Sequence, residues 1–243
     1  MPIVRILSYN VRSLRDDAGA VARVIRSVQP HVVCIQEAPR LLRWRAKCAA
    51  LARRSGLVVV TGGRTAAANL ILSSLDVDVT ATRDVLFTKD RRLHQRGAAL
   101  AVLRCDGGSF AVAGTHLDLV AEPRVRHVGE LGRALTGMVP AGTPTVVAGD
   151  VNDVPGSAAW AQLTEDRLDV WATTGEGDGF TYSAQSPRRR IDGIFTGRGV
   201  VPISARVIDS TDVRRGSDHR PVFVELELPD QLYQNGRGAP PRT

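Results

Sequence analysis

Short apolar runs alternate along this chain with longer segments in which apolar residues recur at helical spacing. The longer segments predict helices at 18–29, 41–54, 122–139 and 157–165. In the first of these, Pro30 ends an apolar stripe formed by Val21, Val24, Ile25 and Val28. The short runs predict strands at 3–11, 31–38, 57–61, 68–74, 76–87, 97–105, 109–117, 144–150, 191–196, 201–208 and 221–228. Strands outnumber helices, so the pattern favours a mixed α/β protein with two sheets between helices.

No repeat, low-complexity block or Pro/Gly/Ser-rich linker divides the 243 residues. A single domain over residues 1–229 is therefore expected. From Asp230 onward the apolar pattern stops and glycine and proline recur, which predicts a flexible C-terminal tail over residues 230–243.

The net charge of +7 is compatible with a polyanionic partner, because neutralising phosphates requires Lys and Arg. Lys47 and Lys89 are the only lysines among the 32 basic residues, however, and such a skew is typical of a GC-rich genome that favours Arg codons throughout. Basic clusters lie at 43–47, 188–190 and 214–215. Both a solvated Arg-rich surface and a polyanion-binding face stay open.

Other features narrow the class of protein. No signal-like N-terminus and no apolar run of about 20 residues is present, which predicts a cytoplasmic protein without a membrane partner, and nothing implies an obligate protein partner. Cys34, Cys48 and Cys105 lack CxxC spacing and stand in apolar stretches, so we expect core packing and neither a disulfide framework nor a zinc site. The histidines that match no motif are expected on the surface or in loops, at His31, His94 and His127.

Unusual polar residues stand repeatedly at the ends of the predicted strands. They are Asn10, Glu37, His116, Asp150 with Asn152, Asp192, and Asp218 with His219. One such residue is usually a helix cap or a turn residue, but six sites are hard to explain as six separate caps. If the strand ends converge, the four carboxylates repel one another unless they share a cation. Oxygen ligands without thiolates suit Mg²⁺, Mn²⁺ or Ca²⁺ rather than zinc.

Together these segments resemble the motif set of the endonuclease/exonuclease/phosphatase (deoxyribonuclease I-like) superfamily. The matching strings, in the family's order, are Ser8-Tyr9-Asn10-Val11, Ile35-Gln36-Glu37, Thr115-His116-Leu117-Asp118, Gly149-Asp150-Val151-Asn152, Arg190-Ile191-Asp192 and Ser217-Asp218-His219. The GDxN string followed by SDH is the specific part. The resemblance implies a four-layer α/β/β/α sandwich with two central mixed, mainly antiparallel sheets.

The resemblance also implies catalytic roles. His219 acts with Asp192, which fixes the imidazole tautomer while the ring takes a proton from the attacking water. Asp150 orients that water or shares the role of base. Asn152 and His116 donate hydrogen bonds to the non-bridging phosphate oxygens.

A second group of residues is implied to bind metal and substrate. Glu37 holds a divalent cation, Mg²⁺ or Mn²⁺, with help from Asn10 and Asp218. Arg12 and Arg96 are candidates for contacts with a substrate phosphate.

The substrate class is less defined than the chemistry. The abasic-site repair nucleases of this superfamily usually carry Tyr where His116 stands, which sets this chain apart from them. The Thr-His-Leu and Gly-Asp-x-Asn-Asp-x-Pro strings are more similar to the deoxyribonuclease I, tyrosyl-DNA phosphodiesterase, deadenylase and sphingomyelinase branches. The first hypothesis is a phosphodiesterase acting on nucleic acid, as a nuclease or an end-processing enzyme. The alternative is a phosphatase or phosphodiesterase of a small or lipid-derived phosphate ester. A catalytically silent binding domain is disfavoured because Glu37, Asp150 and His219 are all retained.

Overall fold

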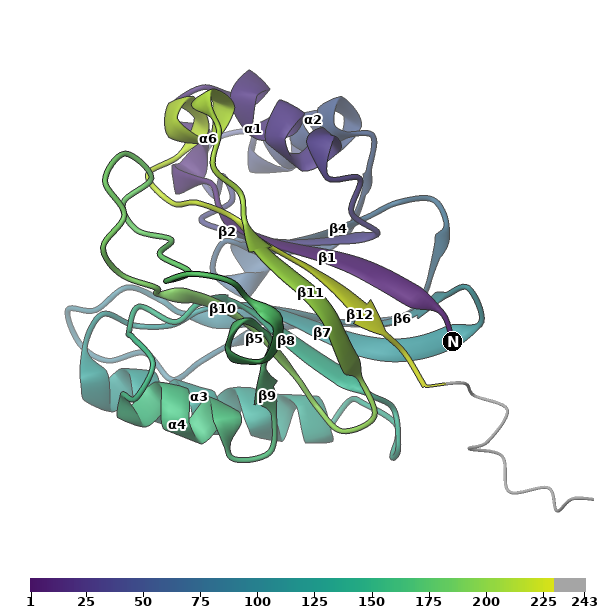
Figure 1. Ribbon diagram of the computed structural model, residues 1–243. Helices are drawn as coiled ribbons and strands as arrows, with labels where there is room; N and C mark the ends of the chain where they lie inside the picture. Colours follow the sequence, from purple (N-terminus) through teal and green to yellow (C-terminus); the bar gives the residue numbers. More distant parts are fainter. Residues whose placement is uncertain (230–243) are drawn as a thin grey trace, which may run out of the picture.

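The computed structural model describes residues 1–229, and the predicted tail over 230–243 lies outside them. Two six-stranded sheets form the centre of the molecule (Figure 1). The first has the order β11-β12-β1-β2-β4-β3. Its strands are β1 (Ile3–Asn10), β2 (Val32–Gln36), β3 (Val58–Gly63), β4 (Asn69–Ser73), β11 (Val201–Val207) and β12 (Val222–Glu227).

The second sheet has the order β5-β6-β7-β8-β10-β9. Its strands are β5 (Val77–Leu86), β6 (Gly97–Cys105), β7 (Gly108–His116), β8 (Thr145–Asp150), β9 (Leu168–Asp169) and β10 (Asp192–Thr196). Each sheet contains one parallel pair, β1 with β2 and β7 with β8, while the other pairs are antiparallel. Both sheets are therefore mixed and mainly antiparallel, as predicted.

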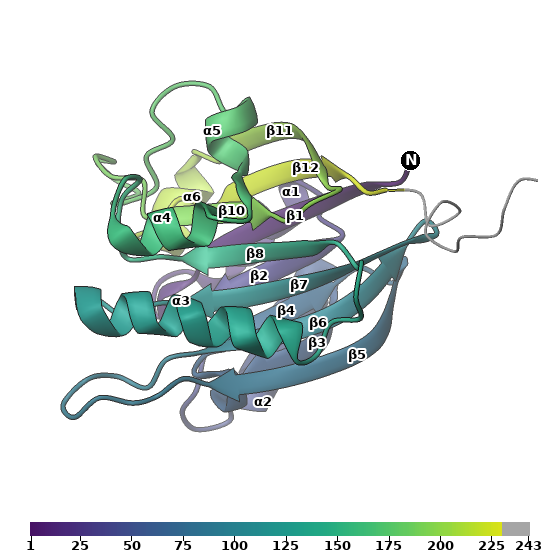
Figure 2. The ribbon, with the colours of Figure 1, turned by 90° about the horizontal axis from the view of Figure 1, so that it is seen from below.

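Helices cover the outer face of each sheet (Figures 1 and 2). Over the first sheet lie α1 (Ala18–Ser27), α2 (Trp44–Ser55) and α6 (Thr211–Gly216); over the second lie α3 (Ala121–Thr136) and α4 (Ala158–Thr164). The short α5 (Val170–Thr174) packs against β11, and single 3-10 turns occur at η1 (Arg12–Leu14) and η2 (Arg64–Ala66). The predicted four-layer α/β/β/α sandwich is confirmed.

Strand β1 illustrates why the sheets stack in this way. Val4 and Ile6 point into the core between the two sheets, whereas Leu7 and Tyr9 point into the core beneath α1 and α2. A strand buried on both faces has a nearly continuous apolar sequence, because side chains alternate between the faces. A third core, which includes Trp160, fills the space between the second sheet and its helices.

The differences from the predicted elements are local. Helix α1 ends at Ser27, three residues before Pro30, because Gln29 adopts a positive φ of 44°. Helix α3 ends at Thr136 rather than at 139. The short elements α5, α6 and β9 were not predicted, since two to six residues are too few to display a period. No helix in residues 1–229 is long and apolar enough to cross a bilayer; the cytoplasmic location and the single domain stay predictions.

Candidate active site

The polar strand ends meet at one rim of the sandwich, at the seam between the two sheets. Strands β1 and β2 carry Asn10 and Glu37 at their carboxyl ends, and β7 and β8 carry His116 and Asp150 at theirs. Each of these pairs is parallel, so the two strand ends of a pair lie at the same edge.

Two residues reach the rim from the other direction. Asp192 begins β10 rather than ending a strand, and it lies opposite Asp150 because β10 runs antiparallel to β8. His219 precedes β12, which runs antiparallel to β1. Both positions agree with the predicted strands at 191–196 and 221–228, and the antiparallel pairing brings the starts of these strands to the same rim.

Asp150 is the centre of the arrangement and is almost fully buried. Its Oδ2 accepts a hydrogen bond from Asn10 Nδ2 at 3.0 Å, and this atom also lies 3.4 Å from His116 Nε2 and 3.8 Å from His219 Nε2. Its Oδ1 accepts the backbone N–H of Asn152 at 2.9 Å. One carboxylate thus contacts side chains from both sheets.

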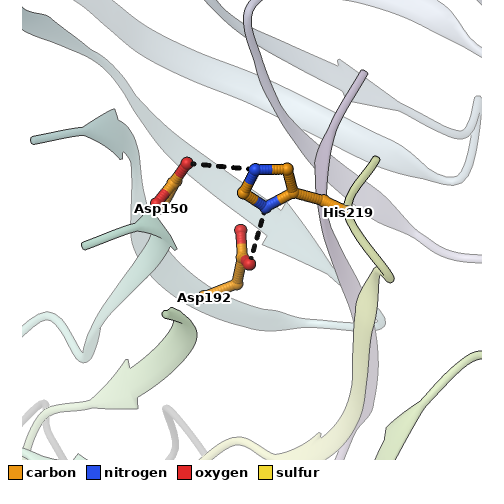
Figure 3. A group of neighbouring side chains, drawn as sticks. All are labelled: Asp150, Asp192 and His219. Atoms are coloured by element: carbon orange, nitrogen blue, oxygen red, sulfur yellow. Dashed lines mark hydrogen bonds and ion pairs between the residues drawn. The ribbon is translucent and has the colours of Figure 1, made fainter. Parts of the chain in front are cut away.

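His219 is held between two carboxylates (Figure 3). Its Nδ1 donates to Asp192 Oδ2 at 2.9 Å, which leaves Nε2 facing Asp150. Burial alone would lower the pKa of His219, but Asp192, Asp150 and Asp218 together raise it to about 10. The carboxylates therefore fix the ring orientation and favour its cationic form.

His116 has the opposite electrostatic balance. Burial lowers the pKa of its imidazole to about 3, although Asp150 acts in the other direction. The Asn152 side-chain amide lies with Nδ2 at 2.9 Å from His116 Nε2 and donates to the Leu117 carbonyl at 3.0 Å. The Leu117 contact fixes the amide orientation, so His116 Nε2 accepts and the neutral ring carries its proton on Nδ1.

Glu37 and Asn10 form the oxygen-rich side of the site. Asn10 Nδ2 also lies 3.4 Å from Glu37 Oε1, so one amide contacts both Glu37 and Asp150. Glu37 adopts a positive φ of 52°, an uncommon conformation for a non-glycine residue that turns the chain immediately after β2.

Asp218 lies slightly apart from these two residues. Its Oδ2 is 3.5 Å from Arg12 Nε, and Arg12 also contacts Asp16 at 3.4 Å. Ser217 connects this segment to β1, because its hydroxyl donates to the Asn10 carbonyl at 2.6 Å and accepts the His219 N–H at 3.2 Å.

Arg96, the second predicted substrate contact, is largely enclosed. Its Nε lies 3.6 Å from Oδ2 of the buried Asp118, and the Arg96 side chain itself is only 11% exposed. Burial lowers the pKa of the Arg96 guanidinium, whereas Asp118, Asp150 and Glu37 act to raise it. Asp118 also accepts the Val120 N–H at 2.9 Å, which stabilises the loop after His116.

A model of the endonuclease/exonuclease/phosphatase family matches residues 7–219, from strand β1 to His219. The chain belongs to this family. Its members are hydrolases that act on phosphoester bonds. No curated protein matches the chain significantly.

Solved structures of family members share the fold. An endonuclease/exonuclease/phosphatase from Bacteroides vulgatus is 20% identical with a TM-score of 0.80, covering 94% of this chain and 100% of that one. A mannosyl-6-phosphatase of Bacteroides thetaiotaomicron is 16% identical with a TM-score of 0.79, covering 93% and 100%. TDP2 of D. rerio, in complex with a single-strand DNA product, is 20% identical with a TM-score of 0.75, covering 93% and 100%.

The sequence analysis missed one residue, Arg124, that lies beside the candidate active site of this chain. Arg124, on α3, is buried and donates to the carbonyls of Asn152 and Leu119, and its Nη1 lies 3.3 Å from Asp153 Oδ2. It therefore links the loops after β7 and β8. An arginine on the apolar stripe of a predicted helix, between Pro123 and His127, was the available signal.

A second group of missed residues holds Asp192 in place. Asp169 accepts two hydrogen bonds from the Arg190 guanidinium, at 3.0 and 2.8 Å, and one from Trp160 Nε1 at 3.0 Å. The Thr181 hydroxyl accepts the Asp192 N–H at 3.3 Å. These contacts fix the chain immediately before β10.

The predictions for the cysteines and for the histidines outside the motifs are confirmed except for His127. All three cysteines are buried and free, as expected. His31 and His94 lie outside the helices and strands, as expected. His127 is not a surface or loop residue: it is 2% exposed on α3, stacks on Phe87, and has Nε2 3.0 Å from the Thr88 carbonyl oxygen. It lies on the buried stripe of the helix, which explains the error.

Proposed function

We propose that this chain hydrolyses phosphodiester bonds with the help of a divalent cation, Mg²⁺ or Mn²⁺. The observation that carries the proposal is the position of His219, which donates to Asp192 through Nδ1 and presents Nε2 to Asp150. In a family of phosphoester hydrolases, this arrangement suits transfer of a proton from an attacking water.

The proton-transfer roles follow from these contacts. His219 Nε2 is the atom that exchanges a proton, and Asp192 holds the ring in the required tautomer. Asp150 orients the attacking water, because its Oδ2 lies within reach of His219 and is fixed by Asn10.

Asn152 and His116 are proposed to bind the non-bridging phosphate oxygens. Asn152 has a positive φ of 57°; its backbone N–H donates to Asp150 Oδ1, and its side-chain amide lies against His116 at the rim. His116 is neutral and its Nε2 accepts from Asn152, so its Nδ1–H is the donor proposed for a phosphate oxygen. Arg12 and Arg96 would add positive charge near the phosphate.

The residues present fit a hard divalent cation. Glu37 and Asp150 direct carboxylate oxygens at the same Asn10 amide, and the free cysteines lie in the cores. We propose Glu37, Asn10 and Asp218 as the ligands. Asp150, Asp192 and His219 also place one ligand atom each within 4.8 Å of the others, but the hydrogen bond between His219 and Asp192 favours a role in proton transfer. The bound ion would polarise the phosphoryl group and offset the carboxylate charge around His219.

Nucleic acid is the first proposed substrate class. The net charge of +7 supports it, and the structurally similar TDP2 of D. rerio was solved with a single-strand DNA product. A nuclease or an end-processing phosphodiesterase would gain affinity from Arg contacts to the backbone.

A small or lipid-derived phosphate ester is the second candidate. A cavity of about 580 Å³ begins three residues after Glu37, and its lining includes Leu41, Leu42 and Leu86 beside three arginines. An apolar wall beside a phosphate site suits a substrate with an apolar leaving group. The similar structure of a mannosyl-6-phosphatase also keeps non-nucleic substrates open.

The test compares bis(p-nitrophenyl) phosphate and p-nitrophenyl phosphate with labelled single- and double-stranded DNA and RNA, in Mg²⁺, Mn²⁺ and EDTA. We expect cleavage that EDTA and His219→Ala both abolish, while His94→Ala, a change at an exposed histidine, retains activity. Steep loss of activity with salt would identify a polyanion, and turnover of the small esters alone would favour the second candidate. Turnover that persists in EDTA would refute the metal-dependent scheme.

A further inference from the structure

The segment between Glu37 and Asp76 contains positive charges and no carboxylate. Its cations are Arg40, Arg43, Arg45, Lys47, Arg53, Arg54 and Arg64, and none of them forms an ion pair with a carboxylate of residues 1–229. Most lie on or near α2, on the outer face of the first sheet (Figure 1). We call residues 40–64 the basic rim.

Two consecutive leucines protrude from the basic rim. Leu41 and Leu42 are 78% and 84% exposed, in the loop that leads into α2. Leu86, 55% exposed on the second sheet, lines the 580 Å³ cavity together with Leu41 and Leu42. Single exposed leucines are common on soluble proteins, but neighbouring ones surrounded by unpaired cations mark an interaction surface.

The basic rim adjoins the candidate active site. Ala38, the residue after Glu37, donates its N–H to the Ala68 carbonyl at 2.8 Å, which ties the start of the loop to the turn after η2. Gln95, which precedes Arg96, lines the same cavity as Arg40. Whatever binds the rim therefore lies beside the catalytic carboxylates.

A nucleic acid is poorly served by this surface. Trp44 is the aromatic residue among those that line the cavity, and its side chain is half-buried. The Arg45 guanidinium stands 4.4 Å from the ring centroid, and the ring packs so closely on Gly63 that a Cβ there would overlap it. The Trp44 ring is already in contact with Arg45 and Gly63, which makes it a poor platform for stacking a base, and exposed leucines gain nothing from a phosphate backbone.

We propose that the basic rim docks on a membrane surface that contains anionic lipids. Leu41 and Leu42 would enter the boundary between headgroups and acyl chains, while the unpaired arginines would bind lipid phosphates. The sequence suggested no membrane partner because no apolar run is long enough to span a bilayer, and a pair of exposed leucines becomes visible only in the folded chain. Docking in this way brings the active-site rim to the headgroup layer.

The experiment is co-sedimentation of the chain with vesicles, in EDTA so that no hydrolysis is required. Vesicles of phosphatidylcholine alone are compared with vesicles containing about one third phosphatidylglycerol. We expect binding to the anionic vesicles only, and a loss of at least about tenfold in affinity with Leu41→Glu/Leu42→Glu. Leu75→Glu is the matched control, since Leu75 is 83% exposed and lies outside the rim.

The cations are tested separately. Arg40→Gln/Arg43→Gln/Arg45→Gln should lower vesicle affinity by about a hundredfold at low salt, since each charge near an anionic surface contributes about fivefold. Arg198→Gln, at an exposed arginine elsewhere, should leave binding unchanged.

Equal binding to neutral and anionic vesicles, or vesicle binding that survives the leucine variant, would overturn the proposal. Loss of single-stranded DNA binding in the arginine variant, without vesicle binding by the unmodified chain, would instead make the rim a nucleic-acid surface. The readout is binding alone, so absence of hydrolysis would refute the proposed function without affecting this result.

Discussion

The guanidinium of Arg124 donates to the backbone carbonyl of Asn152, whose side-chain amide contacts His116 in the candidate active site. The same guanidinium contacts Asp153, so helix α3 holds the loop after β8 by both backbone and side chain. Arg124 is thus a positioning residue for Asn152 and not one that touches the reacting atoms.

We predict that Arg124→Met lowers kcat/KM by about 10- to 100-fold, because displacement of a catalytic group by about 1 Å has an effect of that size. The loss should fall mainly on kcat, and Arg124→Lys should recover part of it. Arg133→Met, at an exposed site on the same helix, is the control. If Arg124→Met lowers the Tm but leaves kcat and KM unchanged below that temperature, Arg124 has a structural role only.

Asp192→Asn is predicted to lower kcat by about 10²- to 10⁴-fold with little change in Tm. The asparagine keeps the shape of the side chain but loses the negative charge that raises the pKa of His219. The Asp192 N–H still donates to Thr181, so the strand should start in the same place. Steady-state kinetics beside Asp106→Asn, in an exposed turn, tests this; near-native kcat would exclude Asp192 from the proton-transfer pair.

Removing Asp169 should be costly to stability. Asp169→Ala leaves the buried Arg190 guanidinium without its partner, and breaking a buried pair in this way costs about 3–5 kcal/mol. Urea unfolding gives the value, and a double-mutant cycle with Arg190→Met isolates the pair. We expect the double variant to be more stable than Asp169→Ala alone, since it removes the unpaired charge. Equal stability of the two would argue that water already compensates the guanidinium.

His31 should make stability depend on pH. Burial, followed by the neighbouring Arg5, lowers the pKa of His31, and Nδ1 accepts the Arg5 N–H at 3.2 Å. The unfolded chain then binds the proton more readily, so this stability is present above the unfolded pKa of about 6.5 and is lost as the pH falls towards the folded value. The Tm difference between the native chain and His31→Gln should shrink between about pH 7.5 and 5. A Tm difference that stays constant over this pH range would contradict a lowered pKa of His31 in the folded chain.

Much of the fold could be predicted because the longer strands and helices show a clear periodicity of apolar residues in the sequence. Strands such as β1 are buried on both faces, and α1 has a complete apolar stripe. Short elements could not be found in this way. Helix α5 has five residues, and it begins where the Asp169 side chain accepts the N–H of Trp171, a contact that also depends on Arg190 twenty-one residues later.

The site was accessible to sequence reasoning for a different reason. The residues proposed to do the chemistry stand in short strings that ordinary turns and helix caps rarely produce, such as Gly149–Asn152 and Ser217–His219. The residues that position these strings, such as Arg124 and Thr181, belong to no motif. Their roles can be recognised only from contacts in the folded structure. Sequence order likewise could not reveal that β10 runs antiparallel to β8, which brings Asp192, at the start of β10, opposite Asp150.

The seam between the two sheets carries a consequence for how activity can be lost. Asp150 and Asp192 belong to one sheet, while Asn10 and His219 flank strands of the other, so neither sheet alone holds a working set of groups. A partly unfolded form that retains both sheets but loosens their contact would keep its circular dichroism spectrum and lose turnover. The proposed activity would therefore be a sensitive reporter of how the two sheets dock on each other.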